Sequence, residues 1–150
     1  MVLPFTVLTR MEIRRVIDIA DRDAAYAVRR AVFQGEQGVP AEIEFDADDE
    51  RAVHMIAADQ GTVVGTGRVV LQPDYAKIGR MAVLPGWRQR GVGRALLDAL
   101  LQEAARRGAP RAVLHAQVQA IGFYARAGFT AVGDEFDEAG IAHRRMEQPL

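Results

Sequence analysis

Cysteine is absent from this chain of 150 residues, and its absence excludes several kinds of chemistry. Without a thiol the chain has no disulfide framework, no thiolate metal ligand and no cysteine nucleophile, so a route through an acyl-cysteine is excluded as well. Histidine is scarce, with three residues, and no two of them have the spacing of metal ligands. We therefore predict no metal site. The lack of cysteine also fits a reducing compartment, and we expect a cytoplasmic protein.

A strong excess of one charge and long apolar runs are missing too. The formal net charge is −1, which predicts neither a nucleic-acid partner nor an anionic membrane surface. No stretch approaches the roughly 18 apolar residues of a membrane-spanning helix. The length is that of one ordinary domain. Residues 1–10 include Pro4 but no basic start and no small-residue cleavage site, so we interpret them as an N-terminal extension and candidate dimer element before a single domain at 11–150.

Hydrophobic periodicity predicts the element order β-α-β-β-β-α-β-α-β-β. A helix is expected within residues 21–33, capped by Asp21, and a longer one from Val92 to just before Gly108. A glycine- and acid-rich loop is expected between the first helix and the second strand. The strands and the remaining helix are expected at 11–18, 52–59, 62–71, 75–84, 111–116, 119–127 (helix), 129–136 and 141–148. This order predicts an α/β (α+β) fold with a mixed, largely antiparallel central sheet flanked by helices.

The segment WRQRGVGRALL, residues 87–97, stands where the pattern changes from strand to helix. A helix start offers unpaired N–H groups and partial positive charge, so a phosphate is its natural ligand, and Gly91 and Gly93 would let it approach closely. A Walker loop needs Gly-Lys-Ser/Thr, and a dinucleotide fingerprint needs a small residue where Leu96 stands, so neither pattern fits. The remaining Arg-x-x-Gly-x-Gly pattern is compatible with a pyrophosphate site or with a plain surface turn.

Residues 78–104, IGRMAVLPGWRQRGVGRALLDALLQEA, closely resemble motif A of the GNAT superfamily of acetyl-CoA-dependent N-acetyltransferases. The resemblance implies that the turn binds the pyrophosphate of coenzyme A, and that the main chain of Met81 and Val83 pairs with the pantetheine arm. It also implies an oxyanion donor at the amide of Gly79 or Met81. The cofactor-binding residues implied in this segment are Met81, Ala82, Val83, Arg88, Gln89, Arg90, Gly91, Val92, Gly93 and Arg94.

Residues 117–129, QVQAIGFYARAGF, resemble motif B of the same family. Gln117 stands where the family more often has an asparagine that contacts the pantetheine, so it joins the implied cofactor site. Tyr124 is the candidate general acid, because a tyrosine of pKa ~10 is protonated at pH 7 and can donate to the departing thiolate. The alternative is that Tyr124 only packs against Phe123.

Direct attack on the thioester needs a neutral amine, yet an alkylamine of pKa ~10.4 is almost wholly protonated at pH 7, so some group must take a proton. Residues 32–50 follow the first helix, where family members build the acceptor site, and they resemble the ElaA-like branch. Glu36 and Glu42 are candidates there for base or acceptor binding, as are Gln37 and Glu44. His115, near the expected thioester, is a further candidate.

Other polar residues receive plainer interpretations. His54 could approach the acceptor, but the simpler interpretation is a structural histidine in a strand, with its hydrogen bonds made within the protein. Residues 48–50 are interpreted as a solvated loop, His143 as a surface residue, and Trp87 as a packing residue or a neighbour of the adenine.

The sequence thus predicts an N-acetyltransferase that moves an acetyl group from acetyl-CoA to a primary amine of a small molecule or peptide, within a ternary complex. Two alternatives stay open. One is a non-catalytic acyl-CoA-binding regulatory module on the same fold. The other is an acyltransferase that uses longer acyl groups, since residues 32–37 loosely resemble acyl-homoserine lactone synthases.

Overall fold

The computed structural model describes residues 11–150, and the extension expected at residues 1–10 lies outside the described part. Seven strands form one sheet in the order β1-β2-β3-β4-β5-β7-β6. All neighbours are antiparallel except β4 and β5, which are parallel. The predicted mixed, largely antiparallel sheet is therefore confirmed. The strands are β1 (Met11–Arg15), β2 (Val53–Asp59), β3 (Thr62–Leu71), β4 (Ala76–Val83), β5 (Arg111–Gln117), β6 (Thr130–Glu138) and β7 (Ile141–Pro149).

The helices complete the predicted order of elements. They are α2 (Ile19–Arg29), α3 (Ala41–Glu44), α4 (Val92–Arg106) and α5 (Ile121–Arg126), with a π-helix η1 (Arg30–Glu36) and the 3-10 turns η2 (Ala47–Glu50), η3 (Pro85–Trp87) and η4 (Val118–Ala120). The segment expected to be a loop after the first helix contains the short helical turns η1, α3 and η2. The predicted cap at Asp21 is wrong: the helix begins earlier, and Asp18 accepts a hydrogen bond from the Asp21 amide at 2.8 Å.

Helix α4 packs closely on one face of the sheet because β3 carries glycines beneath it. A Cβ atom at Gly67 would lie 2.8 Å from Leu100 Cδ1, and one at Gly65 would lie 3.0 Å from Leu96 Cδ1. Both leucines are fully buried, and burying a leucine side chain contributes roughly 1.5–3 kcal/mol. This face holds the main core. The position of α4 relative to β3 and β4 in turn fixes the turn that precedes it.

Helix α2 packs against the opposite face of the same strands. Its Val28, together with Val32 of η1, packs with Ala82 of β4 in a second, smaller cluster. The side chains of Thr66 and Arg68 alternate with the glycines of β3 and are buried, as expected when neighbouring strand residues point to opposite faces. The sheet is therefore covered on both sides at β3 and β4.

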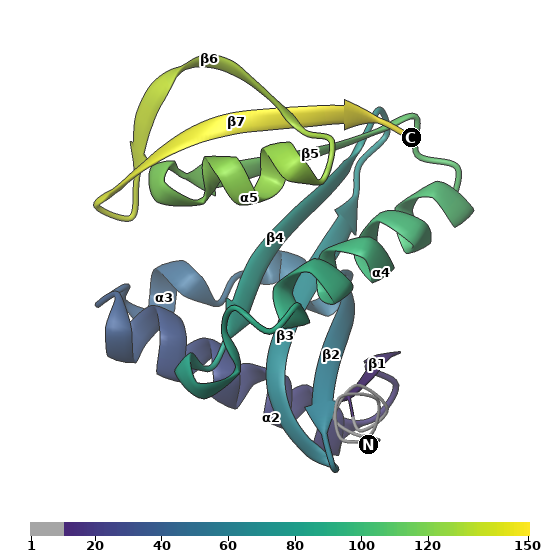
Figure 1. The fold of residues 1–150 in the computed structure, drawn as a ribbon, viewed down its shortest axis with the longest axis vertical. Helices are drawn as coiled ribbons and strands as arrows, with labels where there is room; N and C mark the ends of the chain where they lie inside the picture. Colours follow the sequence, from purple (N-terminus) through teal and green to yellow (C-terminus); the bar gives the residue numbers. More distant parts are fainter. Residues whose placement is uncertain (1–10) are drawn as a thin grey trace, which may run out of the picture.

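The sheet opens between β4 and β5. These strands pair only at Ala76–Ala112 and Lys77–Val113, whereas β5 pairs with β7 over the whole range 111–117. Figure 1 shows the two strands diverging beyond this joint, with β5, β6 and β7 turned away from β1–β4. A bulge contributes to the divergence, because two residues of β4, Arg80 and Met81, face one residue of β3, and Arg80 has a left-handed φ of 53°. This opening positions the candidate site.

Candidate active site

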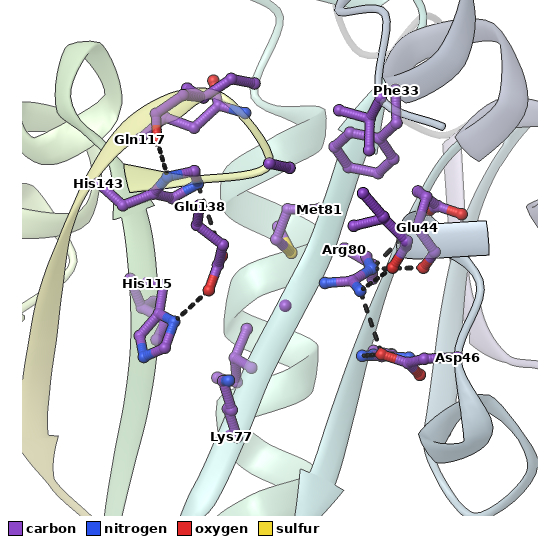
Figure 2. A pocket seen from close by; sticks show the side chains of 18 of the residues that line it. Phe33, Glu44, Asp46, Lys77, Arg80, Met81, His115, Gln117, Glu138 and His143 are labelled. Atoms are coloured by element: carbon purple, nitrogen blue, oxygen red, sulfur yellow. Dashed lines mark hydrogen bonds and ion pairs between the residues drawn. The ribbon is translucent and has the colours of Figure 1, made fainter. Parts of the chain in front are cut away.

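A cavity of about 450 Å³ lies where β4 and β5 part. Its walls come from η1, the α3–η2 segment, β3, β4, β5, η4, α5 and the β6–β7 hairpin. The apolar part of its lining is Phe33, Val39, Ile43, Val70, Ile78, Met81, Leu114 and Ile141. Figure 2 shows charged and polar side chains entering from both sides of the opening. The cavity is therefore an apolar cleft with polar groups at defined places, the usual character of a small-molecule site.

A main-chain amide of β4 faces the opening. The Leu84 amide donates to the Val64 carbonyl at 2.9 Å, so these two residues form a hydrogen-bonded pair and the neighbouring Val83 directs its main chain away from β3. The Val83 carbonyl accepts a hydrogen bond from Arg88 Nε at 2.8 Å. The Val83 N–H therefore points into the space between β4 and β5. An extended ligand there could accept its hydrogen bond, as an added strand would.

A second cavity, of about 350 Å³, lies at the start of α4. It is lined by Val83, Arg88, Gln89, Gly91, Gly93, Arg94, Phe123 and Arg126. Gly91 caps the helix with φ 83°, and Gln89 has φ 59°. Left-handed residues of this kind occur in nests, where successive main-chain N–H groups bind an anion. The structure thus brings together most of the residues that the sequence assigned to the pyrophosphate.

We call the turn at residues 88–94 and the cavity beside it the cradle. The arginines of this cradle differ in their partners. Arg88 pairs with Glu36 at 2.6 Å, Arg94 pairs with Asp98 at 3.0 Å, and Arg90 donates to the Gly86 carbonyl. Arg126 of α5 has no carboxylate partner within residues 11–150 and lines the same cavity. Sequence reasoning missed Arg126. Its place two residues after Tyr124, on the short helix facing the glycine turn, is the signal that could have found it.

The remaining residues assigned to the cofactor divide into two kinds. The side chains of Ala82 and Val92 are buried in the two core clusters, so only their main chains can reach a ligand. Gln117 lines the larger cavity and donates to Gln37 Oε1 at 2.9 Å, joining β5 to the segment after η1 across the opening. The side-chain oxygen of Gln117 accepts a further hydrogen bond from Gln119.

Tyr124 lines the larger cavity from α5. Its ring packs edge-to-face against Phe123 and Phe129, with centroids 5.0 and 6.0 Å away. Burial raises the pKa of its hydroxyl to about 12, so the group stays protonated at neutral pH. No hydrogen bond within the described residues engages this hydroxyl, which leaves its proton for a ligand. Both the packing role and the proton-donor role expected for Tyr124 are compatible with this geometry.

His115 of β5 and Glu138 at the end of β6 form a pair in the cavity wall. His115 Nδ1 donates to Glu138 Oε1 at 2.9 Å, and Phe136 packs edge-to-face on the imidazole. The second Glu138 oxygen lies 3.7 Å from His143 Nε2. The hydrogen bond from His115 lowers the pKa of Glu138, and burial opposes this only in part, so the carboxylate is ionised at neutral pH.

Two residues in this part of the cavity wall, His143 and Glu138, differ from what the sequence predicted. His143 was expected at the surface, which is wrong: it is 7% exposed and lines the cavity, because it pairs with Gln117 at the edge of the opening. Glu138 was missed altogether. Its position just before the turn Ala139–Gly140, where both residues have left-handed φ angles, marks it as the last residue of a hairpin strand, and this could have drawn attention to it.

The opposite wall rests on buried ion pairs. Arg29 of α2 is 1% exposed and pairs with Glu44 at 2.6 Å and Asp49 at 2.7 Å, while Arg68 of β3 also bonds Asp49 at 2.7 Å. Arg80 donates to the Glu44 carbonyl and to Asp46. The interpretation of residues 48–50 as a solvated loop is therefore wrong for Asp49, because two buried arginines need its charge.

The buried pairs also hold His54. His54 is buried, and its Nε2 donates to the Asp49 carbonyl at 2.9 Å; burial lowers its pKa. It does not line the cavity. These contacts fix α3 and η2 against the sheet, so that Glu44 and Asp46 form part of the cavity wall.

Three residues singled out by the sequence lie apart from the larger cavity. Glu36 is engaged by Arg88 beside the cradle, and Glu42 is exposed on α3; neither lines the cavity. Trp87 donates from its indole nitrogen to Asp59 at 2.9 Å and packs on the main core. Of the candidates for base or acceptor binding, the structure brings Gln37, Glu44 and His115 to the same cavity as Tyr124. Glu44 is already paired with the buried Arg29.

Lys77 is a further cavity residue that the sequence reading missed. It is the only lysine of the chain, and all other residues with a positively charged side chain are arginines. It lines the cavity at the joint between β4 and β5. A single lysine in an arginine-rich chain is the signal that could have drawn attention to it.

Within residues 11–150, no group of three or more histidine or acidic side chains is arranged to hold a metal ion. In the same range no helix has the length and hydropathy needed to cross a bilayer.

Comparisons with known proteins agree with the motifs. The family model described as the acetyltransferase (GNAT) domain matches residues 17–150. The uncharacterised N-acetyltransferase YjcF of Bacillus subtilis is 40% identical over 126 residues, which cover 83% of this chain and 89% of that protein. An acyl-CoA N-acyltransferase from Pseudomonas aeruginosa has a similar structure, with a TM-score of 0.80 and 26% identity over 92% of this chain and 97% of that one.

A likeness in fold extends to ElaA of Escherichia coli. Its TM-score is 0.83 at 24% identity, and the match covers 92% of this chain and 99% of that one.

Proposed function

The chain belongs to the GNAT family of acetyltransferases, and we propose that it transfers an acetyl group from acetyl-CoA to a primary amine by direct attack within a ternary complex. The observation that carries the proposal is the alignment of two cavities along β4 and α5. Val83 and Phe123 line the cavity at the glycine turn, while Met81 and Tyr124 line the larger one. A coenzyme A thioester with its pyrophosphate at the turn would present its sulfur beside Tyr124.

The cradle fits a pyrophosphate. The amides at the start of α4, the helix dipole and the guanidinium groups of Arg88, Arg94 and Arg126 all favour a dianionic ligand there. The first turn contains Gly93, whose missing side chain leaves the main chain open to the cavity. The Val83 N–H offers the pantetheine arm a strand-like hydrogen bond. Acetyl-CoA would supply the activated acyl group, and the chain would hold it with main-chain donors.

Tyr124 would act at the leaving group. A hydroxyl of pKa about 12 remains protonated in the working range and can donate a hydrogen bond to the sulfur as negative charge develops there. A thiolate is stable enough to leave when one donor stabilises it, because the pKa of an alkyl thiol is only ~8.5. We assign Tyr124 this stabilising role.

His115 and Glu138 would take the proton of the amine. His115 Nδ1–H donates to the ionised Glu138 carboxylate, so Nε2 of the same imidazole is left to accept a proton from an ammonium group in the cavity. The Glu138 carboxylate orients the ring and stabilises the positive charge. Proton removal by positioned groups contributes typically 10²- to 10⁴-fold to such reactions. Glu36 and Glu42, which lie outside the cavity lining, are not needed for this step.

Two measurements test the proposal. Calorimetric titration with acetyl-CoA should give saturable binding, and incubation with a panel of amines should release free thiol. Because the chain has no cysteine, a thiol reagent reads coenzyme A without background from the protein. A lack of saturable binding at hundreds of micromolar acetyl-CoA would contradict the proposal. Binding without thiol release across the panel would favour a non-catalytic module, and faster turnover with octanoyl-CoA would favour a longer acyl donor.

A further inference from the structure

Three charged side chains converge on the larger cavity from different walls. Figure 2 shows Glu138, Lys77 and Arg80 pointing toward its middle, with Glu138 on the side of β5–β7 and Arg80 on the opposite side. Lys77 enters from β4, at the joint of the sheet. One negative and two positive groups thus face the same space of about 450 Å³.

These groups keep unused bonding capacity. Glu138 is contacted by His115 and His143 but by no lysine or arginine within 4.0 Å in the described part of the chain. Lys77 has no ion pair within residues 11–150, although its charge favours the ionised form of Glu138. Arg80 uses Nε and Nη2 on Glu44, Ile43 and Asp46, which leaves Nη1 for a ligand. A ligand that pairs with these open positions gains charge-assisted hydrogen bonds, which are stronger than neutral ones.

The charges around the cavity balance when its lining and the residues paired with that lining are taken together. The positive groups are Arg29, Arg51, Arg68, Lys77 and Arg80, and the negative groups are Glu44, Asp46, Asp48, Asp49 and Glu138. A simple alkylammonium ion would add an uncompensated positive charge to this site. A ligand with one positive and one negative group would preserve the balance.

We propose that the acceptor is a zwitterion, a small molecule that carries a primary amine and a carboxylate, as a free α-amino acid does. Its ammonium group lies at Glu138 and its carboxylate at Lys77 and Arg80. The inference rests on the proposed acetyl transfer and adds the class of acceptor. Glu138 then binds the ammonium group beside His115, which receives its proton, while the carboxylate of the acceptor fixes the amine in place.

The rest of the lining suits an apolar side chain on such an acceptor. Phe33, Val39 and Ile43 form one apolar part of the wall, and Ile43 is half exposed there without a partner to cover it. Because the thioester end of the donor shares the cavity, its volume leaves room for one small amino acid. Leucine is therefore a suitable probe.

The test compares three acceptors of nearly equal shape: L-leucine, L-leucinamide and isopentylamine, each with saturating acetyl-CoA and a thiol readout. We expect kcat/KM for leucine to exceed that for isopentylamine about 10- to 100-fold, the effect of one or two charge-assisted hydrogen bonds. Leucinamide, which has the same side chain but no carboxylate, should resemble isopentylamine when rates are compared per neutral amine, because an α-amino group has the lower pKa. Equal turnover of all three would overturn the zwitterion while leaving acetyl transfer intact. No thiol release with any amine would remove the proposed function, and the inference with it.

Variants separate recognition from folding. Lys77→Met should reduce the leucine-to-isopentylamine ratio toward one, because only leucine uses the lysine. Arg15→Met, at an exposed site of the edge strand β1, is the matched control and should keep the ratio. Glu138→Gln should lower kcat/KM for all amines, whereas Glu135→Gln, exposed on the same strand, should not. An unchanged ratio in Lys77→Met would overturn the assignment of the carboxylate.

The single lysine also permits a direct binding measurement. Reductive ¹³C-methylation labels Lys77 and the N-terminal amine alone, and Lys77→Arg identifies which NMR signal belongs to the lysine. Leucine added to the protein with coenzyme A should shift the Lys77 signal, and isopentylamine should shift it much less. Equal shifts with both ligands, or none with leucine, would contradict contact between the carboxylate and Lys77.

Discussion

Replacing Gly93 with alanine should separate the stability of the fold from the binding of the cofactor. Gly93 is in the first turn of α4 with an ordinary helical backbone. A Cβ atom there would lie 3.5 Å from Phe123 Cζ and 3.9 Å from Val83 Cγ2, both ordinary contacts. The folded chain can therefore accept the methyl group. Since the same position lines the cradle, the methyl group would occupy space that a phosphate needs.

The two effects have opposite signs. Alanine is favoured over glycine in a helix by roughly 0.5–1 kcal/mol, so Gly93→Ala should raise the free energy of unfolding by up to that amount. For a chain of this size, that raises Tm by about 1–4 °C. Losing one charge-assisted hydrogen bond to phosphate costs about 1.5–3 kcal/mol, which weakens the Kd for coenzyme A about 10- to 150-fold.

Thermal unfolding without ligand and calorimetric titration with coenzyme A measure the two quantities. Gly91→Ala is the contrasting variant: its φ of 83° disfavours any side chain, so it should lose about 1–2 kcal/mol of stability. If Gly93→Ala bound coenzyme A as tightly as the wild type, the phosphate would not lie at this turn, and the argument from the glycine pattern would be refuted.

Three further outcomes are expected. Tyr124→Phe should lower kcat at least tenfold and leave the Kd for coenzyme A within about twofold; because the pKa of Tyr124 is about 12, the wild type should not lose this donor below pH 10. Asp49→Asn should destabilise the fold by about 3 kcal/mol at pH 7, because Arg29 and Arg68 lose a buried counter-charge. Burial raises the pKa of Asp49, but the two arginines outweigh it and lower the pKa from 3.8 to about 2, so the carboxylate contributes about 2 kcal/mol that is present above pH 4 and lost as the pH falls through 2. Urea unfolding between pH 7 and pH 2 should show a weaker pH dependence in this variant, and equal slopes would argue against the assignment. Glu36→Gln should keep kcat within a few-fold and tighten coenzyme A binding by freeing Arg88; a loss of kcat of a hundredfold would restore Glu36 as the base.

Hydrophobic periodicity and turn residues were sufficient to predict most of the fold. The order of strands and helices followed from local patterns, and the long amphipathic run of α4 was visible because Leu96, Leu97 and Leu100 share one face. Local patterns are weaker where a helix depends on distant partners. The segment after the first helix forms the turns η1, α3 and η2 because Arg29 and Arg68 bind its carboxylates, and such pairs across 15 or more residues leave no periodic signal.

The candidate site divides in the same way. The glycine turn and Tyr124 lie in contiguous motifs, so the sequence alone singles out both as candidates. Glu138, His143 and Lys77 reach the cavity from three strands that meet only in the folded sheet. Their common location depends on the pairing of β5 with β7 and on the parting of β4 from β5, which no short stretch of sequence encodes.

The parting of β4 from β5 has a mechanical consequence. Two residue pairs join the sheet at this point, so the four strands on one side and the three on the other are linked by a hinge. A pantetheine arm bonded to β4 and packed beside α5 would bridge the two blocks beyond the hinge, as an additional strand would. Hydrogen exchange of the β4 amides past Lys77 should then slow on binding of coenzyme A. The pantetheine arm would thus act as a reversible additional strand that joins the two parts of the sheet while coenzyme A is bound.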